Sequence, residues 1–272
     1  MKKKTIRFTT IFALTIVSAA ILMALFPSLF TQYDPLELDM SNKLQGPSAA
    51  HWLGTDEYGR DLWSRIVFGA RISISVGFGA AALAMLLGVP LGLLAGFVGK
   101  TTDSIIMRIM DAFMSFPSVL LAILLITIFE PSALTLIFTI SIVSFPAYGR
   151  IVRSSVLSLK EREFVEAARA FGAKRGYLLF RTILPNCASA IIVQFSLFAA
   201  SSILIEASMS FLGLGIQPPA PAWGSMLSYA KTYINQSVTY ILVPSAAIFL
   251  VVLAINLLGD ALREWLDPMK LK

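Results

Sequence analysis

The feature that most restricts the fold of this chain is a series of long apolar stretches separated by short polar intervals. The stretch from Phe8 to Phe30 contains no charged residue, and a helix needs about 20 residues to cross a bilayer core. Charged residues make up 14% of the chain and hydrophobic residues 57%, whereas a soluble domain has about 25% charged residues. The chain is therefore predicted to be an integral membrane protein.

Six apolar stretches are long enough to span a membrane, and they predict an all-α fold with six transmembrane helices. Pro117 is expected to kink the third span. For the first stretch the alternative is a signal peptide cleaved near Ser18-Ala19-Ala20, but such a peptide normally has an apolar core of about 7–15 residues. The predicted spans are residues 8–30, 72–98, 112–129, 132–148, 186–215 and 239–258.

The distribution of lysine and arginine predicts which loops are cytoplasmic. With the N-terminus inside, 17 of the 22 basic residues fall in inner segments, as the positive-inside rule requires. Both termini and the loop at 150–185 are then cytoplasmic. Topology accounts for the net charge of +6, so we expect membrane lipid around the chain and no nucleic-acid partner. Residues 1–71 should form the first helix with an extracytoplasmic segment, and residues 72–272 a core of five membrane helices.

The longest charged segment, from Ser158 to Pro185, predicts two short helices with a bend between them. Ser158 to Glu161 fits a capping box. Gly172 is placed to end the first helix in a left-handed cap. The second helix should stop before Pro185, because proline disfavours helix in the preceding residue and cannot donate a backbone hydrogen bond.

The first of these two helices is predicted to be amphipathic. Its apolar face follows helical spacing and consists of Phe164, Val165, Ala168 and Phe171. Its other face carries charges at the spacing of ion pairs, namely Arg162, Glu166 and Arg169. From the residues alone, this pattern is more typical of a solvated loop helix than of a docking surface.

The polar interval after the first span contains Asp56, Glu57 and Asp61, but not in the spacing of a calcium-binding loop. We expect a surface loop and a short amphipathic helix in which Asp61 pairs with Arg65. The chain has one histidine and one cysteine. A zinc or nickel site built from its own side chains is therefore not expected.

Two features inside the spans are candidates for the translocation path. Gly88, Gly92 and Gly96 form a stripe on one helix face, which favours close helix packing and allows a path-lining role as well. Glu206 is an ionisable group within the fifth span, where such groups are often functional. It could equally be neutralised by a partner or lie at the outer interface.

A Gly99-Lys100-Thr101 sequence suggests a phosphate-binding loop at first sight. A Walker A motif needs glycine five residues before Gly99, and that position holds Leu94. We therefore expect no nucleotide or other cofactor in this chain, and any ATP must be bound by a partner.

Two sequence motifs resemble a known family. Glu166-Ala167-Ala168, with Gly172 and Leu184-Pro185 following, is similar to the EAA loop of ABC importer permeases, although Thr182 stands where the family often has isoleucine. The outer interval resembles the start of the C-type permeases of dipeptide, oligopeptide and nickel importers. The residues that carry this second resemblance are Leu53-Gly54-Thr55-Asp56, Gly59-Arg60-Asp61, Ser64-Arg65, Gly69 and Arg71.

The resemblance covers nearly the whole chain and implies a type I ABC importer-like permease in the bacterial cytoplasmic membrane. It implies no catalytic site, and as partners a second homologous permease, two ATP-binding subunits and an extracytoplasmic substrate-binding protein. The cytoplasmic helix would couple ATP hydrolysis to alternating access. The residues implied in coupling are Arg162, Val165, Glu166, Ala167, Ala168, Arg169, Phe171, Gly172 and Pro185.

The cargo implied by the family is di- or oligopeptides, with nickel or a nickel chelate as the alternative. Two other classes of protein stay open. An ion-coupled secondary transporter would have several paired intramembrane charges and inverted repeats. A membrane scaffold protein would have the Glu166 helix without an ATPase.

Overall fold

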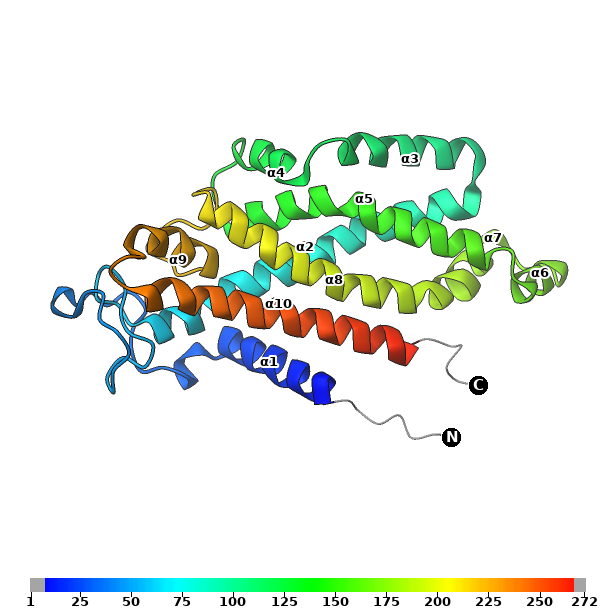
Figure 1. Ribbon diagram of the computed structural model, residues 1–272. Helices are drawn as coiled ribbons and strands as arrows, with labels where there is room; N and C mark the ends of the chain where they lie inside the picture. The colour runs from blue at the N-terminus through cyan, green and yellow to red at the C-terminus, as the bar shows by residue number, and fades with distance from the viewer. Residues whose placement is uncertain (1–7, 267–272) are drawn as a thin grey trace.

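The computed structural model describes residues 8–266, and in this part of the chain nearly all of the regular structure is helical. Five long helices run side by side as an elongated bundle, with α6 at one end and α9 with the loop after α1 at the other (Figure 1). The helices are α1 Phe8–Leu25, α2 Leu62–Val98, α3 Lys100–Met114, α4 Ser118–Ile126, α5 Ala133–Leu159, α6 Glu163–Ala170, α7 Arg175–Tyr177, α8 Leu184–Phe211, α9 Trp223–Ala230 and α10 Val238–Leu266.

The all-α membrane fold is confirmed. Within the described residues, five helices are long and apolar enough to cross a membrane, and α3 with α4 makes a sixth span if the bent pair counts as one. Short 3-10 helices lie at Pro27–Leu29, Met40–Asn42 and Lys231–Tyr233. The predicted division at residue 71 falls inside α2, and the division itself stays a prediction.

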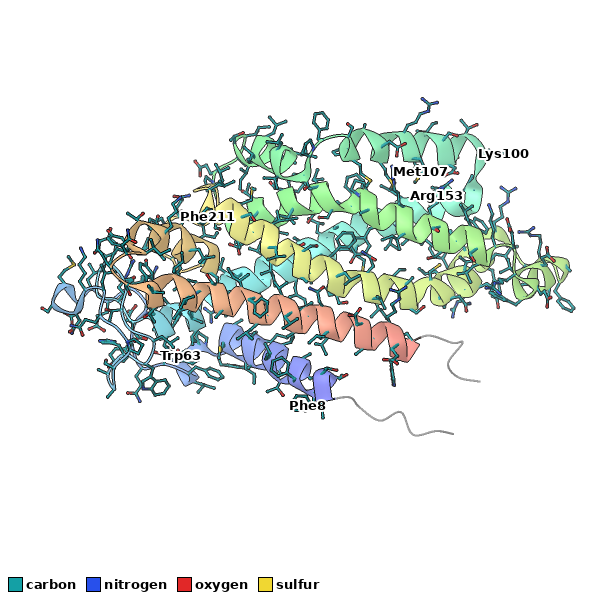
Figure 2. All side chains as sticks on the ribbon, in the orientation of Figure 1. Phe8, Trp63, Lys100, Met107, Arg153 and Phe211 are labelled. Carbon is teal, nitrogen blue, oxygen red and sulfur yellow. The ribbon has the colours of Figure 1, made fainter. Side chains whose placement is uncertain are left out.

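The third span differs from its prediction. The sequence predicted one kinked helix over 112–129, whereas the structure has two helices that meet at 84°. Pro117 stands at the N-cap of α4, where its missing N–H costs nothing. Helix α3 is held against α5 by a two-pronged ion pair, in which Arg153 Nε and Nη2 lie 2.5 and 2.6 Å from the two oxygens of Asp103. Arg153 lies on the side of α5 that faces α3 (Figure 2).

Three spans are longer than predicted. Helix α2 begins at Leu62 rather than at residue 72, since the Asp61 carboxylate accepts a hydrogen bond from Ser64 N at 2.7 Å and caps it. Helix α5 continues past Tyr148 to Leu159. Helix α10 likewise extends beyond the predicted residue 258, to Leu266.

The predicted helix stop before Pro185 is wrong. The chain runs from α7 through Pro185 into α8 by way of a π-helical segment, Leu178–Ile183. In this wider turn Leu184 N donates to Leu179 O, five residues back. In a π-helix each N–H bonds the carbonyl five residues back, so the hydrogen bonds next to Pro185 are shifted. The helix therefore continues through Pro185 although proline has no N–H to donate.

The packing of α2 against α5 is the most extensive interhelical contact of the bundle, and glycine makes it possible. A Cβ atom on Gly88 would lie 2.6 Å from Phe145 O, and one on Gly92 would lie 2.4 Å from Gly149 O. A Cβ atom on Gly96 would lie 2.8 Å from Val156 Cβ. These distances are shorter than any carbon contact, so the two backbones approach as closely as they do only because these three residues lack side chains.

The first prediction concerns this contact. Gly92→Ala should force α2 and α5 apart and lower the free energy of unfolding by about 1–3 kcal/mol, the usual cost of overpacking. Gly176→Ala is the matched control, because a Cβ there has no atom within 4 Å. Thermal unfolding of both purified variants in the same detergent measures the difference. Equal melting temperatures would show that the close α2–α5 contact does not limit the stability of the fold.

Candidate functional site

Helix α6 ends in a well-formed left-handed cap. Gly172 has φ +82°, as the sequence predicted. Its N–H donates to Arg169 O at 3.0 Å, and the Ala173 N–H donates to Ala168 O at 3.1 Å. These two bonds make a Schellman motif, which satisfies the last carbonyls of the helix. Acidic Glu163 and Glu166 lie in the first turn and basic Arg169 in the last, which suits the helix dipole.

One side chain fixes α6 to the membrane bundle. Val165 is fully buried, whereas Ala168 is half-buried. We call the apolar group around Val165 the coupling cluster, because it joins α6 to four other helical elements. Its buried members are Leu93 of α2, Val152 and Val156 of α5, Leu178, Leu179 and Ile183 of the π-helical segment, and Cys187 of α8.

Apart from Val165 and Ala168, the residues of α6 are exposed. Phe171 has 93% of its surface exposed and Phe164 43%, so of the four residues on the predicted apolar face only Val165 and Ala168 pack against the bundle. Phe171 lies at the C-cap, after the last helical residue, Ala170. The other exposed coupling candidates are Arg162, Glu166, Ala167, Arg169, Gly172 and Pro185.

Two local predictions about this segment are also wrong. Ser158 lies in the last turn of α5, and α6 begins after Arg162 without a side-chain cap, so the capping box does not form. Arg162, Glu166 and Arg169 take part in none of the ion pairs found between residues 8 and 266. Their charged groups are left free at the surface instead.

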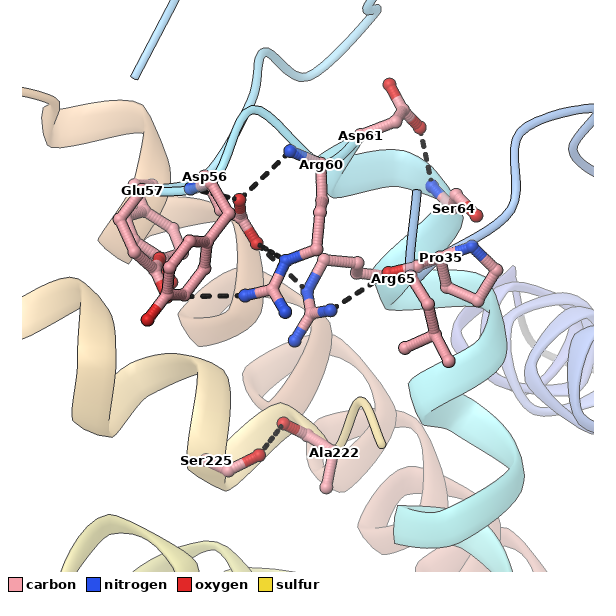
Figure 3. Close-up of polar contacts among 12 residues, drawn as sticks. Pro35, Asp56, Glu57, Arg60, Asp61, Ser64, Arg65, Ala222 and Ser225 are labelled. Atoms are coloured by element: carbon pink, nitrogen blue, oxygen red, sulfur yellow. Dashed lines mark hydrogen bonds and ion pairs between the residues drawn. The ribbon is translucent and has the colours of Figure 1, made fainter. Parts of the chain in front are cut away.

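At the opposite end of the bundle, a buried set of charges links the loop after α1 to α2 and α10. We call Asp56, Glu57, Arg60, Arg65 and Tyr240 the outer cluster, and each is at most 6% exposed. Figure 3 shows the two guanidinium groups converging on the Asp56 carboxylate, where Arg60 Nε lies 2.6 Å and Arg65 Nε 3.3 Å from Oδ2. Two carboxylates face two guanidinium groups, so the buried charges balance.

Hydrogen bonds extend the outer cluster to other segments. Arg65 Nη1 donates to Pro35 O at 2.9 Å, and the Tyr240 hydroxyl donates to the Glu57 carboxylate from α10. Asp56 Oδ1 accepts from Tyr58 N and from Arg60 N, which closes the turn around Gly59. A Cβ on Gly59 would lie 1.6 Å from Asp39 O, so only glycine fits there.

The expected pair of Asp61 with Arg65 does not form. Asp61 caps α2 and lies 3.0 Å from His51 Nδ1, while Arg65 turns to Asp56 and Pro35. The described residues contain no group of three or more potential metal ligands. Asp56 and Glu57 are occupied by arginines, as Figure 3 makes plain.

Glu206 is fully buried where α8 meets α2 and α9. Its Oε1 accepts a hydrogen bond from Ser210 Oγ at 2.8 Å, and its Oε2 has no hydrogen-bond partner. Helix α9 packs at this level, where a Cβ on Gly224 would lie 2.6 Å from Ala207 Cα. It is also hydrogen-bonded to α2, because Trp223 Nε1 donates to Ile66 O at 2.9 Å.

The candidate path residues are therefore separated. Gly88, Gly92 and Gly96 are enclosed between α2 and α5, whereas Glu206 lies among α2, α8 and α9. The residues that sequence reasoning missed are Tyr240, Trp223 and Pro35, whose partners are 183, 157 and 30 residues away in the chain. The sequence signal that pointed to the interval before α2 was its resemblance to a family signature, carried by residues such as Gly54, Asp56 and Arg60.

The second prediction tests the outer cluster. Asp56→Asn removes the charge that two buried arginines share, and should lower the free energy of unfolding by about 3–5 kcal/mol, the cost of breaking a buried pair. Asp111→Asn is the control, because its pair with Arg150 is about half exposed and should be worth at most about 1 kcal/mol. Thermal unfolding in detergent compares them. Similar losses in both variants would contradict a stabilising role for the outer cluster.

Comparison with known proteins gives a consistent assignment. The chain is 48% identical to the dipeptide transport system permease protein of Alkalihalophilus pseudofirmus, over 95% of this chain and 85% of that protein. It is 48% identical to the glutathione transport system permease protein of Pectobacterium atrosepticum, over 84% and 75%. With the di/tripeptide transport system permease protein of Pseudomonas aeruginosa the identity is 44%, over 92% and 84%.

The fold also matches a solved structure, that of the MetNI methionine ABC transporter in inward-facing conformations. The TM-score is 0.63 at 18% identity, with 75% of this chain and 96% of that chain covered. Residues 88–272 match the family described as the binding-protein-dependent transport system inner membrane component. The chain therefore belongs to this family, and it is a multi-pass inner-membrane permease subunit of the ABC importer type rather than an enzyme.

Proposed function

We propose that this chain forms part of the translocation path of an ATP-driven importer of short peptides. The observation that carries the proposal is the geometry of α6. Its charged groups and Phe171 face solvent, while Val165 is buried in the coupling cluster that joins α6 to four other helical elements. A surface of this kind fits a docking partner, because its exposed face is free and its inner face is fixed to the bundle.

The partners in this proposal are a second homologous permease, two ATP-binding subunits and an extracytoplasmic substrate-binding protein. ATP and its magnesium ion would be bound by the ATP-binding subunits, with no cofactor in this chain. When those subunits close, they would move α6, and the coupling cluster would carry the movement into α2, α5 and α8. The path would then open alternately to each side. The termini would be cytoplasmic, on the same side as α6.

Three features support a rigid transmission of this movement. The Schellman cap around Gly172 fixes the direction of the chain after α6. Lys160 Nζ donates to Gly96 O at 3.3 Å and ties the end of α5 to the end of α2. Pro185 follows the π-helical segment, where the helix geometry is set locally. Rigid elements transmit a displacement, whereas loose ones absorb it.

Peptides are preferred over nickel as the cargo. The relatives reported above are named for dipeptides, di/tripeptides and glutathione, all of which are short peptides or peptide-like molecules. Any nickel would have to be held mainly by a binding protein, since this chain has only one histidine and one cysteine. Glu206 and the three glycines are kept as candidates near the path, with close helix packing as the simpler role of the glycines.

The third prediction tests cargo and coupling in one strain that lacks this gene. The wild-type chain should restore uptake of a labelled dipeptide and leave nickel uptake unchanged. Gly172→Val should restore about tenfold less uptake, because a β-branched residue is penalised by about 1–2 kcal/mol in a left-handed conformation. Gly176→Val is the matched control, since its Cβ meets no atom within 4 Å and its φ is not positive.

The outcomes separate the parts of the proposal. Restoration of nickel uptake alone would replace peptide by nickel as the cargo. Wild-type dipeptide uptake by the Gly172→Val variant, at equal membrane expression, would contradict the role of α6. Failure of the wild-type chain to restore either uptake would contradict both proposed cargoes.

A further inference from the structure

A cavity of about 370 Å³ opens where α1 ends beside α2. Most of its lining is apolar, and one positive charge stands in it. The residues that line it are Leu25, Phe26, Pro27, Ser28, Leu29, Phe68 and Arg71. A second cavity of about 540 Å³ adjoins it, because Ser28 and Phe68 line both.

The Arg71 guanidinium is held in place by one hydrogen bond, and its other N–H donors are not paired within residues 8–266. Its Nε donates to Ala24 O in the last turn of α1 at 3.0 Å. Its two terminal nitrogens have no hydrogen-bond or ion-pair partner among residues 8–266. A guanidinium oriented in this way presents two parallel N–H donors, the arrangement that binds a phosphate in a bidentate manner.

The surroundings of the cavity are those of a membrane border. Helix α1 is apolar along its length and ends at Leu25, and a short, mostly apolar segment to Phe30 leads from it into the polar loop. Leu25, Phe26 and Leu29 are between 54% and 80% exposed, so most of their surface is not covered by this chain. Exposed apolar side chains next to a fixed arginine are expected where acyl chains meet phosphate headgroups.

The adjoining cavity supplies a charge of the opposite sign. Asp34 lines it, and its Oδ1 accepts a hydrogen bond from Leu36 N at 2.8 Å, which leaves Oδ2 free to accept another. Gln32 and Tyr33 line the same cavity. A ligand that spans both cavities would therefore meet a cation first and a carboxylate beyond it. A phosphate followed by a primary ammonium fits this order of charges.

We propose that the two cavities bind one phosphatidylethanolamine molecule, with its phosphate on Arg71, its ammonium at Asp34 and the start of its acyl chains against Leu25, Phe26 and Leu29. A lipid headgroup without a cation would bring only its negative phosphate near the negative Asp34 carboxylate, and the two would repel. A trimethylammonium group would offer no N–H to the carboxylate. The site would fix the outer end of α1 against α2, independently of the cargo.

The test is native mass spectrometry of the delipidated full chain in its assembled transporter, titrated with phosphatidylethanolamine, phosphatidylglycerol or phosphatidylcholine. The wild type should bind phosphatidylethanolamine most tightly. Arg71→Gln should weaken that binding by about tenfold, the effect of losing a hydrogen bond to a charged group. Asp34→Asn should remove the preference for phosphatidylethanolamine over phosphatidylglycerol. Arg71→Lys should retain partial binding and serves as a second variant if Arg71→Gln unfolds.

Lys43→Gln is the matched control, because this lysine lies over the Tyr233 ring, away from both cavities, and its loss should leave lipid binding unchanged. Equal lipid binding by the wild type and Arg71→Gln would overturn the proposal. Displacement of the lipid by millimolar inorganic phosphate would overturn it as well, since the site would then be one for free anions. Release of a partner subunit from Arg71→Gln with unchanged lipid binding would show a protein interface instead.

Discussion

The close approach of α2 to α5 is the contact on which the rest of this structure depends. At Gly88, Gly92 and Gly96 the two backbones meet at distances that leave no room for a Cβ atom. In a membrane, apolar side chains gain little by leaving lipid, so helices are held by dispersion between closely packed surfaces. Helix α2 starts at Leu62, beside the outer cluster, and near its other end it contributes Leu93 to the coupling cluster, so the two sites lie along one helix.

The two ends are built by different interactions. At the N-terminal end of α2, buried ion pairs and hydrogen bonds fix the loop after α1 to α2 and α10, with Asp56 at the centre. Such a network has one low-energy arrangement, because each buried charge needs its partner. At the other end of the bundle, α6 is held mainly through Val165, in a cluster without charges. Burial of apolar surface holds this end together, and no buried ion pair is needed there.

Local rules predicted the features of this chain that depend on neighbouring residues. The left-handed conformation of Gly172 and the burial of Val165 follow from spacing within a few residues, and the six apolar stretches follow from composition. Helix ends were predicted poorly, because Asp61 caps α2 well outside the apolar stretch and a π-helical segment carries the chain through Pro185.

The outer cluster could not be predicted from the sequence, for a different reason. Arg65 was expected to pair with Asp61 by helical spacing, but the loop brings Asp56 to it, and Tyr240 reaches Glu57 from the last helix. Pairing between distant segments depends on the tertiary fold, which spacing along the chain does not contain. Phe171 is a separate case. It lies outside the helical register because the helix ends one residue earlier.

The central claim is that movement of α6 reaches the membrane helices through Val165. The direct measurement is the number of peptide molecules imported for each ATP hydrolysed by the complete transporter in proteoliposomes. Val165→Ala should lower this ratio while the ATP-binding subunits still co-purify, because the cavity left in the coupling cluster loosens α6. Ala167→Ser, on the exposed face of α6, is the control and should keep the wild-type ratio. An unchanged ratio in Val165→Ala would contradict the account.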